Sequence, residues 1–198
     1  VALASDGVEA GVRYAGDTLW FGLSLYDNRY RDFIETLRFV GINDEGLQVF
    51  QSQNVADARI RGAELKAGVD FGRLDERLRG WSLRGAVAYA HGQDWTEDRP
   101  LDSIDPLRGS IGLAFARERW GAELAGSFAG RKQRVSDDAL YQPAGYGVLD
   151  LLAHWRFAPG ARVNVGVFNL GDKRYIDWAD VPGVAATSNT LDRYTHAG

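Results

Sequence analysis

Side chains alternate between apolar and polar with a period of two along most of this sequence, and no other feature restricts its fold so strongly. In residues 63–71 every second residue is apolar, and the residues between them are Glu64, Lys66, Gly68 and Asp70. Successive side chains of a β-strand point to opposite faces, so a strand here has one apolar and one largely charged face, whereas a helix would mix the two sets. The segment therefore predicts a β-strand with two chemically different faces.

Seven further segments show the same alternation, which predicts an all-β chain of about eight antiparallel strands. They are 8–14, 19–26, 81–89, 107–115, 120–131, 149–157 and 163–167. Segments 27–36 and 48–58 stay strand-like but lose the apolar phase, so we expect them to extend past the apolar region into water.

Aromatic residues of the apolar phase gather at strand ends, beside connections that we expect to be short (15–18, 72–80, 116–119 and 158–162). A soluble core gives no reason for this placement, whereas aromatic rings in a membrane protein settle at headgroup depth. These residues are Tyr14, Phe71, Trp81, Phe115, Trp120, Trp155 and Phe157.

The remaining connections are long and polar (36–48, 95–105, 132–144 and 171–192). Short turns at one end and long loops at the other are typical of outer-membrane β-barrels, whose short turns are periplasmic. The sequence therefore predicts a transmembrane β-barrel wall in the bacterial outer membrane, with lipid against its apolar face.

Composition narrows the function classes. The absence of cysteine excludes a disulfide framework, a thiolate nucleophile and a cysteine-based zinc site in this sequence. The sequence contains no block or stripe of basic residues that would predict a nucleic-acid-binding surface. No run approaches the roughly 18 to 20 apolar residues that a membrane-spanning helix needs.

Strand direction predicts that the chain is part of a larger barrel. The first strand ends at a short turn, so the chain starts on the long-loop side and returns there after eight strands. We expect 193–198 to open a ninth strand. Such a sheet has open edges, which lipid does not tolerate, so we expect further strands in the parent protein.

Five segments, read in order, resemble the C-terminal barrel of TonB-dependent receptors, nearest to the haemoglobin/transferrin/lactoferrin and haem receptor branch. They are 5–14 (SDGVEAGVRY), 54–64 (NVADARIRGAE), 100–108 (PLDSIDPLR), 146–150 with 167–175 (VFNLGDKRY), and 193–195 (RYT).

The resemblance implies that residues 1–198 are a partial barrel domain, strands 14 to 21 of 22, with the plug domain and TonB box outside this sequence. It also implies a receptor that imports an iron-bearing ligand, haem or haemoglobin or a siderophore, with energy from the TonB complex through the plug. Haem would then be a transported ligand, and no cofactor is expected. The segment with the branch's Phe-Arg-Ala-Pro motif and haem-binding histidine is not in this sequence.

Two groups of residues are candidates for ligand contact. Recognition concentrates on loops, so the first group holds the loop aromatics: Tyr30, Phe33, Trp95, Tyr141, Tyr175 and Trp178. The second group is the polar phase that would line the lumen, where the plainer expectation is pairing across strands or with the plug: Glu64, Lys66, Arg84, Arg108, Glu123, Asp150, His154 and Arg156.

Two other functions stay open at this point. An outer-membrane protease or phospholipase could use His91, Asp94, Ser103 and Asp105, but nothing places a base beside a nucleophile, so no catalytic residue is assigned. A soluble lipocalin-like or sandwich carrier would instead point its apolar phase inward. The three histidines show no metal-ligand spacing, so no metal site is expected.

Overall fold

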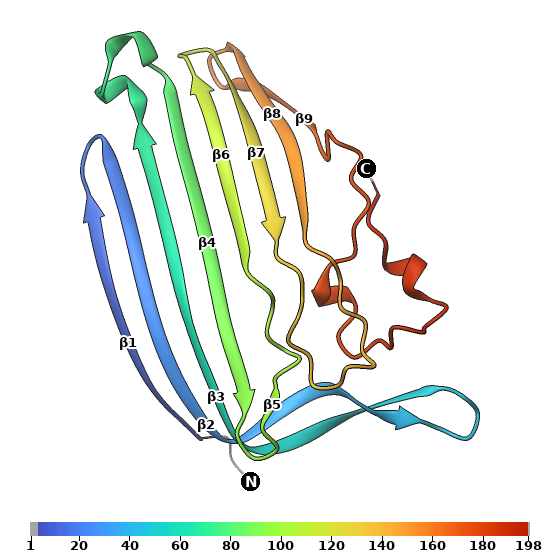
Figure 1. Cartoon of the computed structure of the whole chain (residues 1–198). Helices are drawn as coiled ribbons and strands as arrows, with labels where there is room; N and C mark the ends of the chain where they lie inside the picture. The colour runs from blue at the N-terminus through green and yellow to red at the C-terminus, as the bar shows by residue number, and fades with distance from the viewer. Residues whose placement is uncertain (1–3, 198) are drawn as a thin grey trace.

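The computed structural model describes residues 4–197, apart from the side chains of residues 35–39, 48, 53, 55 and 56. One antiparallel sheet runs through most of the chain (Figure 1). Its neighbours follow sequence order, which confirms the predicted all-β fold with eight main strands. They are β1 (Ala4–Ala15), β2 (Leu19–Ile42), β3 (Gln48–Asp70), β4 (Trp81–Asp94), β6 (Arg108–Ala116), β7 (Trp120–Ala129), β8 (Tyr146–Ala158) and β9 (Ala161–Val167); the two-residue β5 (Arg99–Pro100) pairs with β4.

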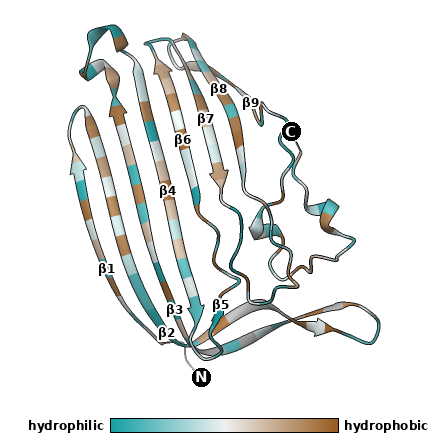
Figure 2. Ribbon diagram, viewed as in Figure 1, coloured by the Kyte–Doolittle hydropathy of each residue, from teal (hydrophilic) through white to brown (hydrophobic). Residues whose placement is uncertain are grey.

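The strand register aligns the apolar phases of neighbouring strands into rows. Leu113 of β6 lies opposite Leu83 and Leu124, and Leu124 lies opposite Leu151. Leu113, Leu124 and Leu151 are 38%, 41% and 40% exposed, so the described chain leaves much of each side chain open. Figure 2 shows the same alternation as brown and teal bands along the strands. One face of the sheet is therefore apolar, and the described part of the chain leaves it largely uncovered.

Aromatic side chains form a band at the short-turn end, as predicted. The ring centroids of Trp81 and Phe115 are 5.0 Å apart, and Phe115 lies 5.1 Å from Trp120. Across β7 and β8, Trp120 is the register partner of Trp155, whose ring lies 5.7 Å from Phe157. Edge-to-face and offset ring pairs at such spacings are favourable, so the band is continuous across four strands.

The connections at the upper end of the sheet in Figure 1 are tight, as expected. The longest of them holds two 3-10 turns, η1 (Phe71–Arg73) and η2 (Glu76–Leu78), capped by Asp70 and Asp75. Gly80 ends this connection with φ 95°, and a Cβ there would lie 2.5 Å from the carbonyl oxygen of Ala116. Only glycine fits this position without strain.

The hairpin of β2 and β3 reaches farther than the sequence predicted. We expected a loop over 36–48, but the connection is only 43–47, because backbone pairing continues after the apolar phase ends. Asn43 closes the turn by accepting hydrogen bonds from the amides of Glu45 and Leu47, at 3.1 and 2.8 Å. Strand pairing in water needs no apolar face, so periodicity alone could not locate this turn.

The chain after β9 corrects another expectation. Residues 193–197 do not form a ninth strand within the described chain. Instead the 3-10 turn η4 (Leu191–Tyr194) is followed by one isolated bridge between His196 and Tyr175. Asn169 and Asp172, which precede Tyr175, have positive φ, so the backbone between β9 and this bridge is not a continuous extended strand. Within residues 4–197, no helix is long and apolar enough to cross a membrane.

Candidate functional site

The predicted lumen residues all lie on the face of the sheet opposite the leucine rows. The register places each of them in the polar phase of its own strand, so one continuous polar wall crosses β3 to β8. They are Glu64 and Lys66 on β3, Arg84 on β4, Arg108 on β6, Glu123 on β7, and Asp150, His154 and Arg156 on β8.

One ion pair spans the middle of this wall. Arg84 donates through Nη2 to both carboxylate oxygens of Glu123, at 2.7 and 2.8 Å. The two residues lie on strands separated by β6, and Gly112 of β6 lies beneath the carboxylate with no side chain to obstruct it. Arg84 is well exposed, so the pair orients two polar groups but adds little stability.

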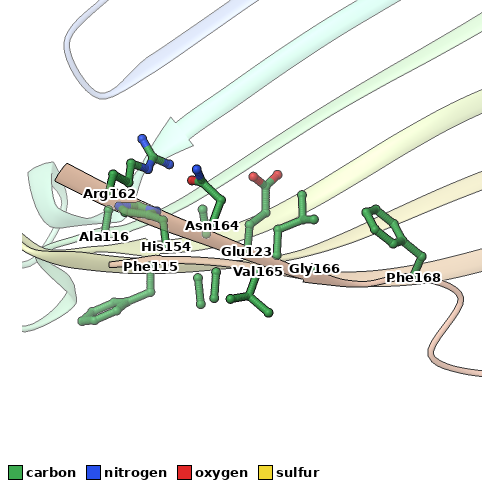
Figure 3. A pocket seen from close by; sticks show the side chains of 13 residues that line it. Phe115, Ala116, Glu123, His154, Arg162, Asn164, Val165, Gly166 and Phe168 are labelled. Carbon is green, nitrogen blue, oxygen red and sulfur yellow. The ribbon is translucent and has the colours of Figure 1, made fainter. Parts of the chain in front are cut away.

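A shallow pocket of about 400 Å³ lies on the polar face beside β9. Figure 3 shows Glu123, Arg162 and Asn164 on one side of the sheet and Phe115 on the other. His154 lines the pocket and lies over Gly121, where a Cβ would be 2.5 Å from its Cε1. The pocket therefore offers hydrogen-bonding groups of mixed charge to whatever fills the interior.

Arg108 fastens the C-terminal loop to the polar wall. Its guanidinium makes a two-point ion pair with Asp177, with Nη1 donating to Oδ2 at 2.8 Å. The hydroxyl of Tyr146 donates to the same oxygen at 2.6 Å. Chiefly because of the Arg108 hydrogen bonds, the pKa of the Asp177 carboxyl is held well below its usual range.

Two outer loops, 130–145 and 168–197, share a hydrophobic core that the sequence did not predict, and hydrogen bonds join a third loop, 95–107, to it. We call them together the loop unit. Trp178 is only 3% exposed and donates through Nε1 to the carbonyl oxygen of Asp102 at 2.8 Å. The ammonium of Lys132 lies 4.3 Å from the Trp178 ring centroid, and the Asp102 carboxylate accepts from the amide of Ser136 at 2.8 Å. The core residues around Trp178 are Val135, Leu140, Val181 and Val184.

The loop aromatics that we proposed for ligand contact take different positions. Trp178 belongs to the buried core, and Tyr141 packs against it. Tyr175 stacks on Tyr146, at 4.0 Å between ring centroids, and on His196, at 4.9 Å. The structure therefore gives these three residues structural contacts within and beside the loop unit.

The other three candidates lie around the base of the long hairpin. Tyr30 is in the polar phase of β2, and its ring centroid is 5.4 Å from that of Phe33. Trp95 instead follows β4 in the outward phase and is 48% exposed. The guanidinium carbons of Arg29 and Arg59 lie 5.5 and 5.3 Å from its ring centroid. The six candidates thus do not form one common surface.

The acidic residues considered for catalysis have structural partners. Asp94 is buried and accepts hydrogen bonds from the amides of Thr96 and Glu97, at 2.8 and 3.1 Å. Asp105 forms an ion pair with Arg108 at 3.2 Å. Among residues 4–197, no three His, Asp or Glu side chains come together in a group that could hold a metal ion.

Sequence reasoning missed the loop unit because its residues follow no period. One pattern pointed to it. The loop that we described as polar contains Ile176, Trp178, Val181 and Val184, four large apolar residues within nine positions. A solvated loop has no need for such a cluster, so its density in a long connection indicates a local core.

Known proteins resemble this chain along nearly its whole length. The family model described as "TonB dependent receptor-like, beta-barrel" matches residues 4–170. A probable hemoglobin and hemoglobin-haptoglobin-binding protein of Haemophilus influenzae is 24% identical over 218 residues, which cover 96% of this chain and 22% of that protein.

Solved structures share the fold. The copper transporter OprC superposes with a TM-score of 0.83 at 26% identity, covering 99% of this chain and 30% of OprC. A ferric enterobactin receptor mutant from Pseudomonas aeruginosa superposes with a TM-score of 0.71 at 21% identity, with the same two coverages. The chain therefore spans between about a fifth and a third of the length of these proteins.

Proposed function

The chain belongs to the family of TonB-dependent receptor β-barrels, and from this premise we propose that it forms one part of the wall of a receptor that imports an iron-bearing ligand. Proteins of this family are outer-membrane barrels, so the apolar face meets lipid and the polar face meets the lumen. In this proposal the plug domain lies elsewhere in the full-length protein, and TonB delivers energy through that plug.

The observation that carries the proposal is the contrast between the two faces of one sheet. Row after row of apolar side chains stays open on one face, while charged groups such as Glu64 and Arg84 occupy the other. A soluble carrier would bury its apolar phase inside, so the exposed rows of Leu113 and Leu124 oppose that alternative. A lipid-facing wall explains both faces.

Within this wall we assign roles by position. The lumen charges and the pocket beside His154 contact the plug or solvate the interior, since they line a broad, open polar surface. Tyr30, Phe33 and Tyr175 are the ligand-contact candidates: Tyr30 lies in the polar phase at the outer end, Phe33 contacts the Tyr30 ring, and Tyr175 lies on a loop. Tyr141 and Trp178 act indirectly by holding the loops in place.

Iron-bearing ligands are favoured over copper for this segment. A relative's name refers to hemoglobin and a structural neighbour's title to ferric enterobactin, whereas OprC is titled a copper transporter. Soft sulfur ligands select Cu(I), and this sequence has neither cysteine nor methionine. We therefore propose haem, haemoglobin or a ferric siderophore as the ligand.

A growth assay tests the proposal. The full-length protein is expressed in a bacterial host whose own haem and siderophore receptors are deleted. We expect growth on haemoglobin, haem or a ferric siderophore as the sole iron source, and we expect deletion of the host TonB gene to abolish it. Growth that does not depend on TonB, or failure on all of these iron sources, would contradict the proposal.

The enzyme alternative has its own measurement. A barrel protease or phospholipase would release peptide or fatty acid from added substrate, and the His91→Ala variant would lose that release. We expect no difference between the wild-type protein and the variant.

A further inference from the structure

The lipid-facing side of the sheet changes from apolar to charged between two neighbouring register rows near its outer end. Leu25, Ala63 and Tyr89 form the last apolar row on β2, β3 and β4. In the next row the corresponding residues are Asp27, Arg61 and His91. One row farther out, Arg29 lies directly opposite Arg59. Alternate residues share a face, so these arginines are on the outside of the barrel wall.

Arg134, from the loop 130–145, joins this surface by donating from Nη2 to Oε1 of Gln93 at 2.6 Å. Gln93 is the register partner of Arg59, which places Arg134 beside the arginines of β2 and β3. We call Arg29, Arg59, Arg61 and Arg134 the basic patch. Its members come from two strands and a loop that are far apart in the sequence.

Internal partners neutralise only part of the basic patch. Asp27 forms an ion pair with Arg59. In the part of the chain that the structure describes, no ion pair involves Arg29, Arg61 or Arg134. Arg29 lies between Arg59 on β3 and Asp6 on β1, and Asp6 already forms an ion pair with Arg31. Like charges directly opposite each other are destabilising, so the positive charge that remains around Arg29 and Arg59 favours an anion from outside.

Trp95 completes the surface. Its half-exposed ring contacts the guanidinium groups of both Arg29 and Arg59. Contact with an aromatic face favours the charged guanidinium and fixes its position. Tryptophan is also a residue that settles at the boundary between hydrocarbon and headgroups. The basic patch thus lies at headgroup depth, at the long-loop end, which faces the outer leaflet.

We propose that the basic patch binds the phosphorylated headgroup of an outer-leaflet glycolipid. Arginine presents a planar array of donors that matches phosphate oxygens, and a sugar headgroup with two phosphates can reach Arg29 and Arg61 together. The imported ligand passes on the opposite face of the wall. The inference therefore rests on the outer-membrane placement of the sheet and not on the identity of that ligand.

Native mass spectrometry of the purified full-length protein in detergent tests this inference. The probe is lipid A with two phosphates, and the variant is Arg29→Gln with Arg61→Gln. We expect binding to weaken about 25-fold, which corresponds to about 1 kcal/mol for each arginine. Wild-type protein should bind dephosphorylated lipid A as weakly as the variant binds the phosphorylated form.

A matched control removes the same charge at the other end of the barrel. Arg73→Gln with Arg77→Gln alters two exposed arginines of the short-turn connection and should leave lipid A binding unchanged.

If the variant Arg29→Gln with Arg61→Gln does not fold, as judged by its heat-dependent gel mobility, Arg134→Gln on the loop tests the same surface. Equal binding by wild type and variants would overturn the inference. So would equal affinity for phosphatidylglycerol, because the patch would then lack selectivity for a glycolipid. No iron source is present, so the result is independent of the growth assay.

Discussion

Replacing Trp178 with alanine is expected to release three outer loops at once while the sheet stays paired. The side chain is almost fully buried, and it links its own loop to Asp102 by a hydrogen bond and to Lys132 by a cation–π contact. Truncation of a buried tryptophan costs about 3–5 kcal/mol. The population of the opened loop unit should therefore rise by roughly two to four powers of ten.

Hydrogen exchange of backbone amides, followed by mass spectrometry of the full-length protein, measures this opening. We expect exchange to accelerate together in 95–107, 130–145 and 168–197, and to stay slow in β6 and β7. Trp178→Phe keeps most of the apolar contact and loses the indole donor, so its effect should be nearer fivefold, for about 1 kcal/mol.

The control is Trp95→Ala, which removes a tryptophan of the outer surface that is not part of the loop core. This variant should leave the exchange of 130–145 and 168–197 unchanged, and in 95–107 it should affect only the residues next to position 95. The reasoning fails if Trp178→Ala accelerates only its own loop, because the three loops would then be independent. It fails equally if the strands lose protection, because the loop unit would then support the sheet.

Three further predictions concern the wall and its attachment to the loops. Leu124→Arg, in the middle of the lipid face, should lower the free energy of unfolding from lipid vesicles by about 2–4 kcal/mol, measured by urea titration. Ala125→Arg, at the neighbouring lumen-facing position, should lower it far less. Equal losses of unfolding free energy would contradict the assignment of faces. The pKa of Asp177 is lower in the folded protein than in the unfolded chain, so its ion pair stabilises the loop fully above the unfolded pKa and loses this effect as pH falls through the folded pKa. A fluorophore attached to the variant Ser188→Cys should therefore stay immobile from pH 7 to pH 4 and gain mobility only in stronger acid. In a protein that also carries Asp177→Asn, the fluorophore should be mobile throughout. Glu123→Gln should change the free energy of unfolding by less than about 1 kcal/mol, because Arg84 is largely exposed; a larger loss would show that this ion pair is shielded from solvent.

The sheet could be predicted from the sequence because its information is local. Alternation with period two located the strands, and the phase that holds Leu113 and Leu124 assigned the face. The aromatic band could be located by the same phase, since Trp81 and Trp120 lie beside short turns. In each case neighbouring residues carry the pattern, so no knowledge of distant contacts was needed.

The outer end could not be predicted in the same way because its order comes from contacts between distant segments. Trp178 meets Asp102 across 76 positions, and Arg108 meets Asp177 across 69. No periodic pattern encodes such pairings. The end of the β2–β3 hairpin was misplaced for a related reason: both of its faces meet water, so side-chain polarity no longer reports strand pairing.

The position of the buried core gives this protein two separate stability problems. The hydrophobic core lies among the water-exposed loops, whereas the apolar side chains of the sheet are covered only by the hydrocarbon of a bilayer. Urea and heat are therefore expected to unfold the loop unit first. A change of bilayer thickness or of detergent is expected to destabilise the strands. Mutations that stabilise the loop unit need not stabilise the sheet. The sequence of the outer loops can therefore change in evolution without compensating changes in the membrane-embedded strands.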